Sequence, residues 1–360
     1  MYIGQKGDHL AEIPKAHPSI DEVYLIQAGK FRRYHGEGLK QLLDLKTGYK
    51  NVRDVGKVTI GAAQAYSLLG KIRPDVVFTP GGFVGVPVGL AASRRKIPFV
   101  THDLDALPGL ANRINARWAS IHAVGMPPEL YPYPAHKTRF VGVPTSREFQ
   151  PVTQKLQQSY REKIGLGTYE KMLFVVGGGL GAQRINTAVL AIAHRLLAAE
   201  PGVCVVHGAG KANQADVQAA YERVLDSDML KRVQVMGYID SLYRYSGAAD
   251  VIITRAGATN MAEFTIQKKA CIVIPSPFLA GGHQLKNVEP FVKADAIVVV
   301  DEAKLPAQPE ILLAAVQDLL DNANLRQELG ERLGLFAAPD AAGSLAKLVV
   351  ELAESGHATS

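Results

Sequence analysis

The stretch MLFVVGGGLGAQRIN, residues 172–186, decides the fold of this chain. An apolar run typical of a buried strand leads into glycines at 177, 178, 179 and 181, and a helix-forming segment follows. Such a turn lets the backbone approach a phosphate, while the helix N–H groups and dipole favour negative charge. The stretch predicts a phosphate-facing loop; the plainer alternative is a tight strand-to-helix turn.

Strands and helices alternate on both sides of this stretch, a pattern typical of parallel α/β sheets covered by helices. The second half predicts a complete doubly wound, Rossmann-like sheet. Its expected strands are 172–176, 203–207, 233–236, 251–254, 271–274 and 296–299, and its helices 182–199, 214–225, 241–246, 259–268 and 283–293. The first half predicts strands 22–26, 75–78, 98–101, 120–124 and 139–141, with helices 59–71, 86–96 and 109–118.

The chain has 360 residues, which is too long for one ordinary core. We expect a first Rossmann-like domain at 1–144, a linker at 145–170, a second domain at 171–335, and a C-terminal helix at 336–360 that can pack back on the first. The fold class is α/β with two doubly wound domains facing a cleft, where strand-end loops meet.

The composition favours a globular protein without a membrane span. Hydrophobic residues make up 47% and charged residues 21%, which suits a globular protein. No apolar run is long enough to span a bilayer, and the start lacks a signal peptide, so the expected location is the cytoplasm. Cys204 and Cys271 lie in apolar runs and are expected to be buried thiols.

A basic segment, residues 30–57, carries eight Lys and Arg against Glu37, Asp44 and Asp54. This charge indicates either a solvated loop or attraction to an anionic membrane surface or a pyrophosphate. We see no basic helix or aromatic platform for nucleic acid, which is therefore not an expected partner.

Two function classes compete for the glycine loop. Gly177, Gly179 and Ala182 also match the dinucleotide fingerprint, which would make the chain a nicotinamide-dependent oxidoreductase. That fingerprint requires an acidic residue at the end of the next strand to hold a ribose hydroxyl. The strand ends instead in His207 and Gly208, which disfavours the oxidoreductase.

Two further polar loops follow predicted strands. Residues 254–260 read TRAGATN, and Glu263 falls on the first turns of the next helix, where a carboxylate can accept two hydrogen bonds from a ribose diol. A favourable charge near a helix N-terminus is the alternative role of Glu263. Residues 275–287 supply the third loop, with Gln284 and Asn287.

These motifs together resemble the MurG-type glycosyltransferases of family 28. The similar segments are GGGLGAQRIN, HGAGK, RAGATNMAE and IPSPF with HQLKN in the second half, and YIG, GKFRR, TPGGFVGVPVGLAA and THDLDALPGLANR in the first. The resemblance covers nearly the whole chain. It implies a metal-independent GT-B transferase without a cofactor, peripheral on the inner face of the cell membrane.

The resemblance also implies the site residues. Glu263 would bind the uridine ribose, Ile239 the uracil through its backbone, and Gly179 and Gly181 the diphosphate. The other expected donor contacts are Gly257, Ala258, His283, Gln284 and Arg147, the last standing one residue further from Pro144 than in the family. The expected acceptor side consists of Gly81, Gly82, His102, Asp103, Asp105 and Asn112.

The implied reaction moves N-acetylglucosamine from UDP-N-acetylglucosamine to lipid I, a lipid-linked pyrophosphate, with inversion at the anomeric carbon. His102 and Asp103 are the candidate bases. Asp103 and Asp105 stand where the family has Glu and Asn, so a related transferase with a different lipid acceptor is the main alternative, and a non-catalytic UDP-sugar-binding protein is another. The Asp103-Leu104-Asp105 triplet is not expected to bind metal.

The family opens with a strand and the loop GGTGGH, whereas Met1 here directly precedes what should be the second strand. From this the sequence predicts a misplaced start or a truncation, with intact donor binding and poor turnover. A parallel sheet without that strand would expose backbone groups, so the first domain should be the weaker one.

Overall fold

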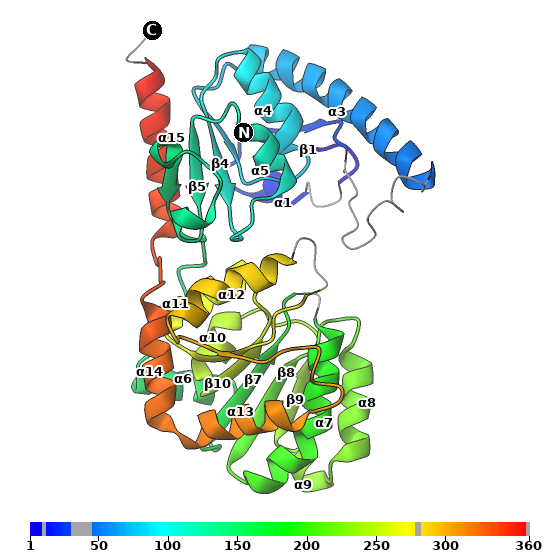
Figure 1. Ribbon diagram of the computed structural model, residues 1–360, viewed down its shortest axis with the longest axis vertical. Helices are drawn as coiled ribbons and strands as arrows, with labels where there is room; N and C mark the ends of the chain where they lie inside the picture. Colours follow the sequence, from blue (N-terminus) through cyan, green and yellow to red (C-terminus); the bar gives the residue numbers. More distant parts are fainter. Residues whose placement is uncertain (9–11, 30–44, 180, 278–281, 358–360) are drawn as a thin grey trace. The chain divides into compact units, whose positions relative to one another are not determined.

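Figure 1 shows the computed structural model, which describes the chain except residues 9–11, 30–44, 180, 278–281 and 358–360. The chain divides into two compact units. The first comprises Met1–Gly142 with Ala341–Ser360, and the second comprises Val143–Asp340. Most of the basic segment 30–57 lies outside the described residues.

The second unit contains six parallel strands in the order β12-β11-β10-β7-β8-β9, and Figure 1 labels β10, β7, β8 and β9 of this sheet. The chain enters at β7 and builds outward to both sides, which confirms the doubly wound sheet. The strands are β7 (Lys171–Val176), β8 (Val203–Gly208), β9 (Val233–Met236), β10 (Val251–Thr254), β11 (Ala270–Val273) and β12 (Val298–Val299).

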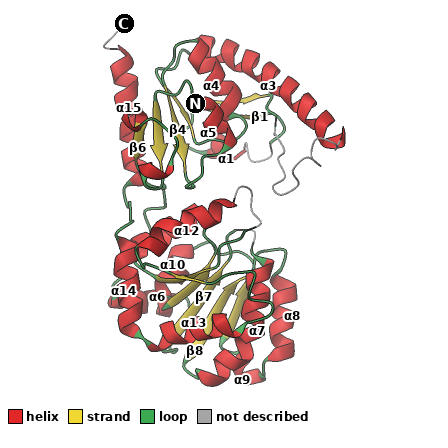
Figure 2. Ribbon diagram, in the orientation of Figure 1, coloured by secondary structure: helices red, strands yellow, loops and turns green. Residues whose placement is uncertain are grey.

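Helices flank this sheet on both faces (Figure 2). They are α6 (Gln154–Lys163), α7 (Gln183–Ala199), α8 (Gln214–Val224), α9 (Ser227–Leu230), α10 (Leu242–Ala248), α11 (Ala258–Gln267), α12 (His283–Lys293), α13 (Glu310–Asp321) and α14 (Ala323–Gly334). The sequence predicted the positions of α7, α8, α10, α11 and α12 to within two residues at each end.

The central strands are buried on both faces, as parallel strands between helix layers must be. Every residue of β8, β10 and β11 is buried. Leu173 and Val175 of β7 share one core with Ile185 and Ile192 of α7. The neighbouring Phe174 faces the other layer and stacks on Tyr245 of α10, with ring centroids 6.3 Å apart.

The expected linker, residues 145–170, is part of the second unit, because buried polar contacts fix α6 to it. Arg161 of α6 forms an ion pair with Asp250 and donates from Nε to the Ala248 carbonyl oxygen at 3.0 Å. Asp250 also accepts the Met172 N–H of β7 at 2.6 Å. These bonds join α6 to the amino ends of β7 and β10.

The first unit contains two parallel sheets. One pairs β1 (Tyr2–Gln5) with β2 (Val23–Ile26), and the other has the order β3-β4-β5-β6. The second sheet consists of β3 (Val77–Thr79), β4 (Phe99–Asp103), β5 (Ile121–Val124) and β6 (Thr138–Phe140), and the helices of this unit include α1 (Glu12–Ala16), α3 (Leu45–Ile72), α4 (Gly85–Arg94) and α5 (Leu110–Asn115).

The two sheets share one core, in which Ile26 of β2 lies with Val77 and Phe99. Helix α3 approaches the end of β2 closely: a Cβ at Gly61 would lie 1.9 Å from the Gln27 carbonyl oxygen, so only glycine fits there. Among the described strands, none joins the two sheets into one.

The C-terminal helix α15 (Ala341–His357) belongs to the first unit. Its Leu345 is buried with Val100 of β4, Ala123 of β5 and Val141. In the described part of the chain, no helix is long and apolar enough to cross a membrane.

Candidate functional site

The glycine loop lies between β7 and α7, as the sequence predicted. Gly178 and Gly181 have positive φ angles, +100° and +79°, and the Gly181 N–H bonds the Gly178 carbonyl at 2.9 Å. A Cβ at Gly181 would lie 2.1 Å from the Ala209 carbonyl oxygen, whereas one at Gly179 would meet nothing within 4 Å. The loop is thus tight against the end of β8 but open at Gly179, where an anion can approach.

The N-terminus of α7 is suited to hold that anion. Ala182 stands at its N-cap position and supplies no side-chain hydrogen bond to the first turn. The N–H groups of the first turn therefore keep their capacity to bind a ligand, and the helix dipole adds to the attraction.

A buried polar network fixes this loop to the end of β8. Asn186 of α7 contacts His207 Nε2 through Oδ1 at 3.0 Å and donates from Nδ2 to the Ala209 carbonyl at 3.1 Å. Tyr221 contacts His207 Nδ1 at 2.9 Å. Burial lowers the pKa of His207 to about 4, so the ring is neutral at physiological pH. The sequence analysis did not single out Asn186, although an Asn in the first turn after a glycine loop was a usable signal.

Glu263, near the carboxyl ends of the strands of the second unit, is a buried carboxyl group. It lies on α11, its side chain is nine-tenths buried, and its Oε2 has no hydrogen-bond partner among the described residues. Desolvation raises its pKa to about 7. A buried carboxyl oxygen without a donor is costly, so this position is suited to a ligand that brings hydroxyl donors.

Other donor-side residues lie at neighbouring strand ends. Gly257 is the N-cap of α11, whose first residue is Ala258, and no described side chain caps that helix. Ile239 lies beside the end of β8, since a Cβ at Gly208 would be 3.0 Å from its Cδ1. Gln284 of α12 is buried, and its Oε1 accepts the Ser276 N–H at 2.9 Å. His283 begins α12.

Arg147 is exposed in the segment before α6, and no contact given by the described residues joins it to these strand ends. Residues 278–281 of the third polar loop lie outside the described residues.

The first unit gathers most of its predicted residues around Asp103. This carboxylate accepts Asn112 Nδ2 at 2.9 Å, the Tyr133 hydroxyl at 2.7 Å and the Gly109 N–H at 3.2 Å. Burial raises its pKa, and the three donors oppose that shift. Tyr133 was missed, because a residue 30 positions away in a proline-rich segment gives no local signal.

Asn112 connects Asp103 to its neighbours. It also donates to the His102 carbonyl at 2.8 Å, and a Cβ at Gly81 would lie 3.4 Å from its Nδ2. Gly81 and Gly82 both have positive φ angles, which explains the two glycines. Asp105 is held through its backbone, whose carbonyl accepts the Tyr131 hydroxyl at 3.0 Å.

His102 is buried, and its Nε2 contacts the Gly142 carbonyl oxygen at 3.0 Å. Burial lowers its pKa, so the ring is neutral at pH 7 and Nε2 donates to that carbonyl. To accept a proton through Nε2, His102 would have to release Gly142.

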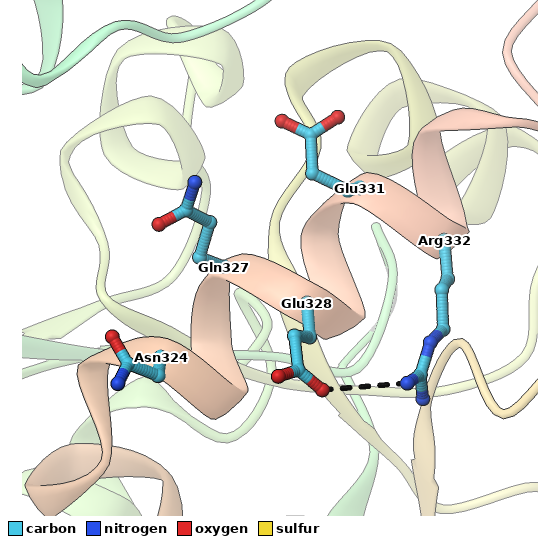
Figure 3. A pocket seen from close by; sticks show the side chains of 5 residues that line it. All are labelled: Asn324, Gln327, Glu328, Glu331 and Arg332. Atoms are coloured by element: carbon cyan, nitrogen blue, oxygen red, sulfur yellow. Dashed lines mark hydrogen bonds and ion pairs between the residues drawn. The ribbon is translucent and has the colours of Figure 1, made fainter.

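A surface hollow lies elsewhere, on α14. It is lined by Asn324, Gln327, Glu328, Glu331 and Arg332, and Figure 3 shows all five side chains on that one helix, with a Glu328–Arg332 ion pair at 3.3 Å. No strand-end loop contributes to its lining, so it is separate from the glycine loop and from Glu263. Within the described residues, no group of three or more His, Cys, Asp or Glu side chains could hold a metal ion. Cys204 and Cys271 are buried free thiols, as predicted.

Two Rossmann-like units with glycine-rich loops at the carboxyl ends of parallel strands are the architecture of the GT-B fold, which glycosyltransferases such as MurG have. The family model described as the glycosyltransferase family 28 C-terminal domain matches residues 172–345, and that of the N-terminal domain matches residues 3–123. The chain belongs to glycosyltransferase family 28.

Three curated relatives carry the same name, UDP-N-acetylglucosamine–N-acetylmuramyl-(pentapeptide) pyrophosphoryl-undecaprenol N-acetylglucosamine transferase. The protein of Citrifermentans bemidjiense is 30% identical over 84% of this chain and 80% of its own length. That of Salinibacter ruber is 34% identical over 83% and 77%, and that of Bacillus subtilis 28% identical over 95% and 94%.

Solved structures share the fold. MurG of Acinetobacter baumannii matches with a TM-score of 0.70 and 20% identity, over 97% of this chain and 90% of that one. Anabaena HepE in complex with UDP and glucose matches with a TM-score of 0.55 and 14% identity, over 97% and 98%.

Proposed function

We propose that the chain transfers N-acetylglucosamine from UDP-N-acetylglucosamine to undecaprenyl-pyrophosphoryl-muramyl-pentapeptide, converting lipid I to lipid II in peptidoglycan synthesis. Family membership and the shared name of the curated relatives support this reaction. The main structural support for donor binding comes from Glu263, a buried carboxyl group whose Oε2 has no hydrogen-bond partner among the described residues.

In this proposal the second unit holds the donor. Glu263 accepts hydrogen bonds from the ribose diol, and Ile239 lies at the uracil. Gly179, Gly181 and the N-terminus of α7 face the diphosphate. Gly257 and Ala258 lie beside the sugar-phosphate, while His283 and Gln284 contact the sugar hydroxyls and Arg147 supplies charge from the preceding segment.

The first unit holds the lipid-pyrophosphate acceptor, with Gly81, Gly82, Asp105 and Asn112 on that side. A base takes the proton from the acceptor hydroxyl, whose oxygen then attacks the anomeric carbon as the bond to UDP breaks. The α7 N-terminus stabilises the charge that develops on the departing diphosphate. His102 and Asp103 are the proposed bases, and Asn112 and Tyr133 fix the orientation of Asp103.

Titration calorimetry tests the donor half. We expect the chain to bind UDP-N-acetylglucosamine and not NADH. Glu263→Ala should weaken donor binding by about 1–3 kcal/mol, because charge-assisted hydrogen bonds are lost. Glu222→Ala, an exposed carboxylate on α8, is the matched control. An unchanged dissociation constant in Glu263→Ala would remove the ribose assignment, and tight NADH binding would restore the oxidoreductase.

Donor binding should not need a metal ion, because the glycine loop and α7 can stabilise the diphosphate without one. Calorimetry with and without chelator decides this point. Binding that chelator abolishes and magnesium or manganese restores would contradict it.

Because the proposed acceptor is lipid-linked, we also propose that the basic segment 30–57 holds the chain at an anionic membrane surface on the cytoplasmic side, at about 1 kcal/mol per well-placed charge. Sedimentation with anionic liposomes at rising salt is the measurement. If Lys40→Glu, Lys46→Glu and Lys50→Glu together leave binding unaltered, the segment is only a solvated loop.

A further inference from the structure

A buried carboxylate, Glu302, joins two arginines at the carboxyl edge of the six-stranded sheet. Its side chain is 1% exposed. Glu302 Oε1 pairs with Arg255 Nη2, and Glu302 Oε2 lies 3.4 Å from Arg184 Nη1. None of the three residues has a role in the donor site described above.

The cluster spans loops that follow four adjacent strands. Arg255 comes directly after β10 and donates from Nη1 to the Ile274 carbonyl, just after β11, at 3.0 Å. Glu302 follows β12. Arg184 is the second residue of α7, immediately behind the glycine loop that follows β7. Since the sheet order is β12-β11-β10-β7, the cluster lies along the same edge as that loop.

The two arginines of this cluster differ in how exposed they are. Arg255 is 11% exposed and forms a fixed buried pair with Glu302, whereas Arg184 is 56% exposed. A buried ion pair costs desolvation and is weak evidence for stability, but it can fix the position of its members.

Arg184 therefore combines two properties suited to a phosphate contact. Its guanidinium is a planar donor that matches phosphate oxygens. It stands in the first turn of α7, where the helix dipole attracts anions and the N-cap residue, Ala182, supplies no side-chain hydrogen bond. Independently, Glu263 lies on α11, the helix that follows the neighbouring strand β10, and its buried Oε2 has no hydrogen-bond partner among the described residues, which also indicates a ligand on this side of the sheet.

We infer that Arg184 binds the diphosphate of the nucleotide-sugar donor, and that Glu302 is a positioning residue that fixes Arg184 and, through Arg255, the loop after β10. This inference rests on the proposed function. It adds a side-chain cation to a diphosphate site otherwise built from backbone N–H groups.

Competition calorimetry on the full chain tests the inference with UDP, uridine and inorganic pyrophosphate as separate probes. Arg184→Gln should weaken UDP binding about tenfold and leave uridine binding unchanged, because the lost contact is to phosphate. Arg184→Lys should retain part of the affinity. Arg195→Gln, an exposed arginine three turns further along α7, is the matched control and should bind UDP as the unaltered chain does.

Glu302→Gln separates positioning from folding. It should lower UDP affinity several-fold without changing uridine affinity, and circular dichroism reports whether the variant is folded; if it is not, the Arg184 variants still decide. Equal UDP affinity in Arg184→Gln and the unaltered chain would overturn the inference, as would equal losses for UDP and uridine. If Arg184→Gln lost affinity for pyrophosphate but not for UDP, the inference would also be overturned. The Arg184 guanidinium would then be assigned to the lipid-linked acceptor. If the unaltered chain binds neither UDP nor uridine, the proposed function fails with it.

Discussion

The two units differ in how their parallel strands are joined into sheets. In the second unit six strands form one sheet, and every residue of its strands β8, β10 and β11 is buried. In the first unit the described strands form two sheets, in which β4 is buried throughout. Phe78 of β3 and Tyr2 of β1 are 40% and 39% exposed, as is Val299 (40%) on the edge strand β12 of the second unit. Parallel strands normally need cover on both faces and both edges. Six paired strands thus give the second unit one continuous frame for its strand-end loops, whereas the described strands of the first unit are divided between two smaller sheets.

The largest expected effect is a loss of stability in the second unit when its buried Arg161–Asp250 ion pair is removed. Asp250→Asn leaves the Arg161 guanidinium buried without its carboxylate and weakens the bond to Met172. Removing one partner of a buried ion pair costs about 3–5 kcal/mol. Urea unfolding followed by circular dichroism is the measurement, and the transition of the second unit should move to lower urea.

The exposed pair Lys231–Asp228 in the same unit provides the control, since Asp228→Asn should not change the transition measurably. If Asp250→Asn behaved like this control, α6 would not depend on its buried contacts, and residues 145–170 would be a linker after all.

The second prediction concerns Glu263, whose burial weakens the otherwise well-packed second unit. Its pKa is raised from 4.5 to about 7, so between these values the native state holds a proton that the unfolded state has lost. The stability that this proton supplies is complete below pH 4.5 and is lost as the pH rises through 7. Glu263→Gln should therefore stabilise the ligand-free chain at pH 8 by about 3 kcal/mol at most and change little at pH 4.5.

Urea unfolding at pH 4.5, 6 and 8 measures this difference. Glu222→Gln on the exposed face of α8 should follow the unaltered chain at every pH. A Glu263→Gln variant equally stable to the unaltered chain at pH 8 would show that the carboxyl group has found a donor.

The smallest expected effect is the change in stability when a partly exposed residue of the first unit, Phe78 of β3, is substituted. Phe78→Thr should change stability by less than about 0.5 kcal/mol, because the side chain is partly exposed on a sheet edge. Phe174→Leu, in the centre of the other sheet, should cost about 1 kcal/mol or more. Thermal unfolding of the two variants gives both values, and a larger loss for Phe78→Thr would indicate that this edge is covered.

The sequence was most informative where burial is continuous. Strands such as β10 were predicted to the residue, because an apolar run between glycine and polar loops leaves few alternatives. Helix α6 was placed in a linker, because its sequence is polar and the partners of Arg161 lie 87 and 89 residues away. Pairings at that distance leave no periodic signal.

The candidate site likewise contains residues that the sequence could predict and contacts that it could not. The strand-end positions of Gly179, Gly257 and Glu263 followed from local order along the chain. The sequence could not show that Tyr133 bonds Asp103 or that His102 bonds Gly142, because those contacts depend on how distant segments pack. Such contacts determine which lone pairs a base can offer.

The placement of α15 has a consequence for the order of synthesis. The sheet face formed by Val100, Ala123 and Val141 is completed by Leu345, about 200 residues later in the chain. At roughly 5–20 residues per second, ribosomes need some 10–40 s to make the intervening segment. The second unit is fully translated in that interval, so this face of β4 and β5 is covered only when the final helix has been made, whereas the separate core around Val77 and Phe99 contains no residue of α15.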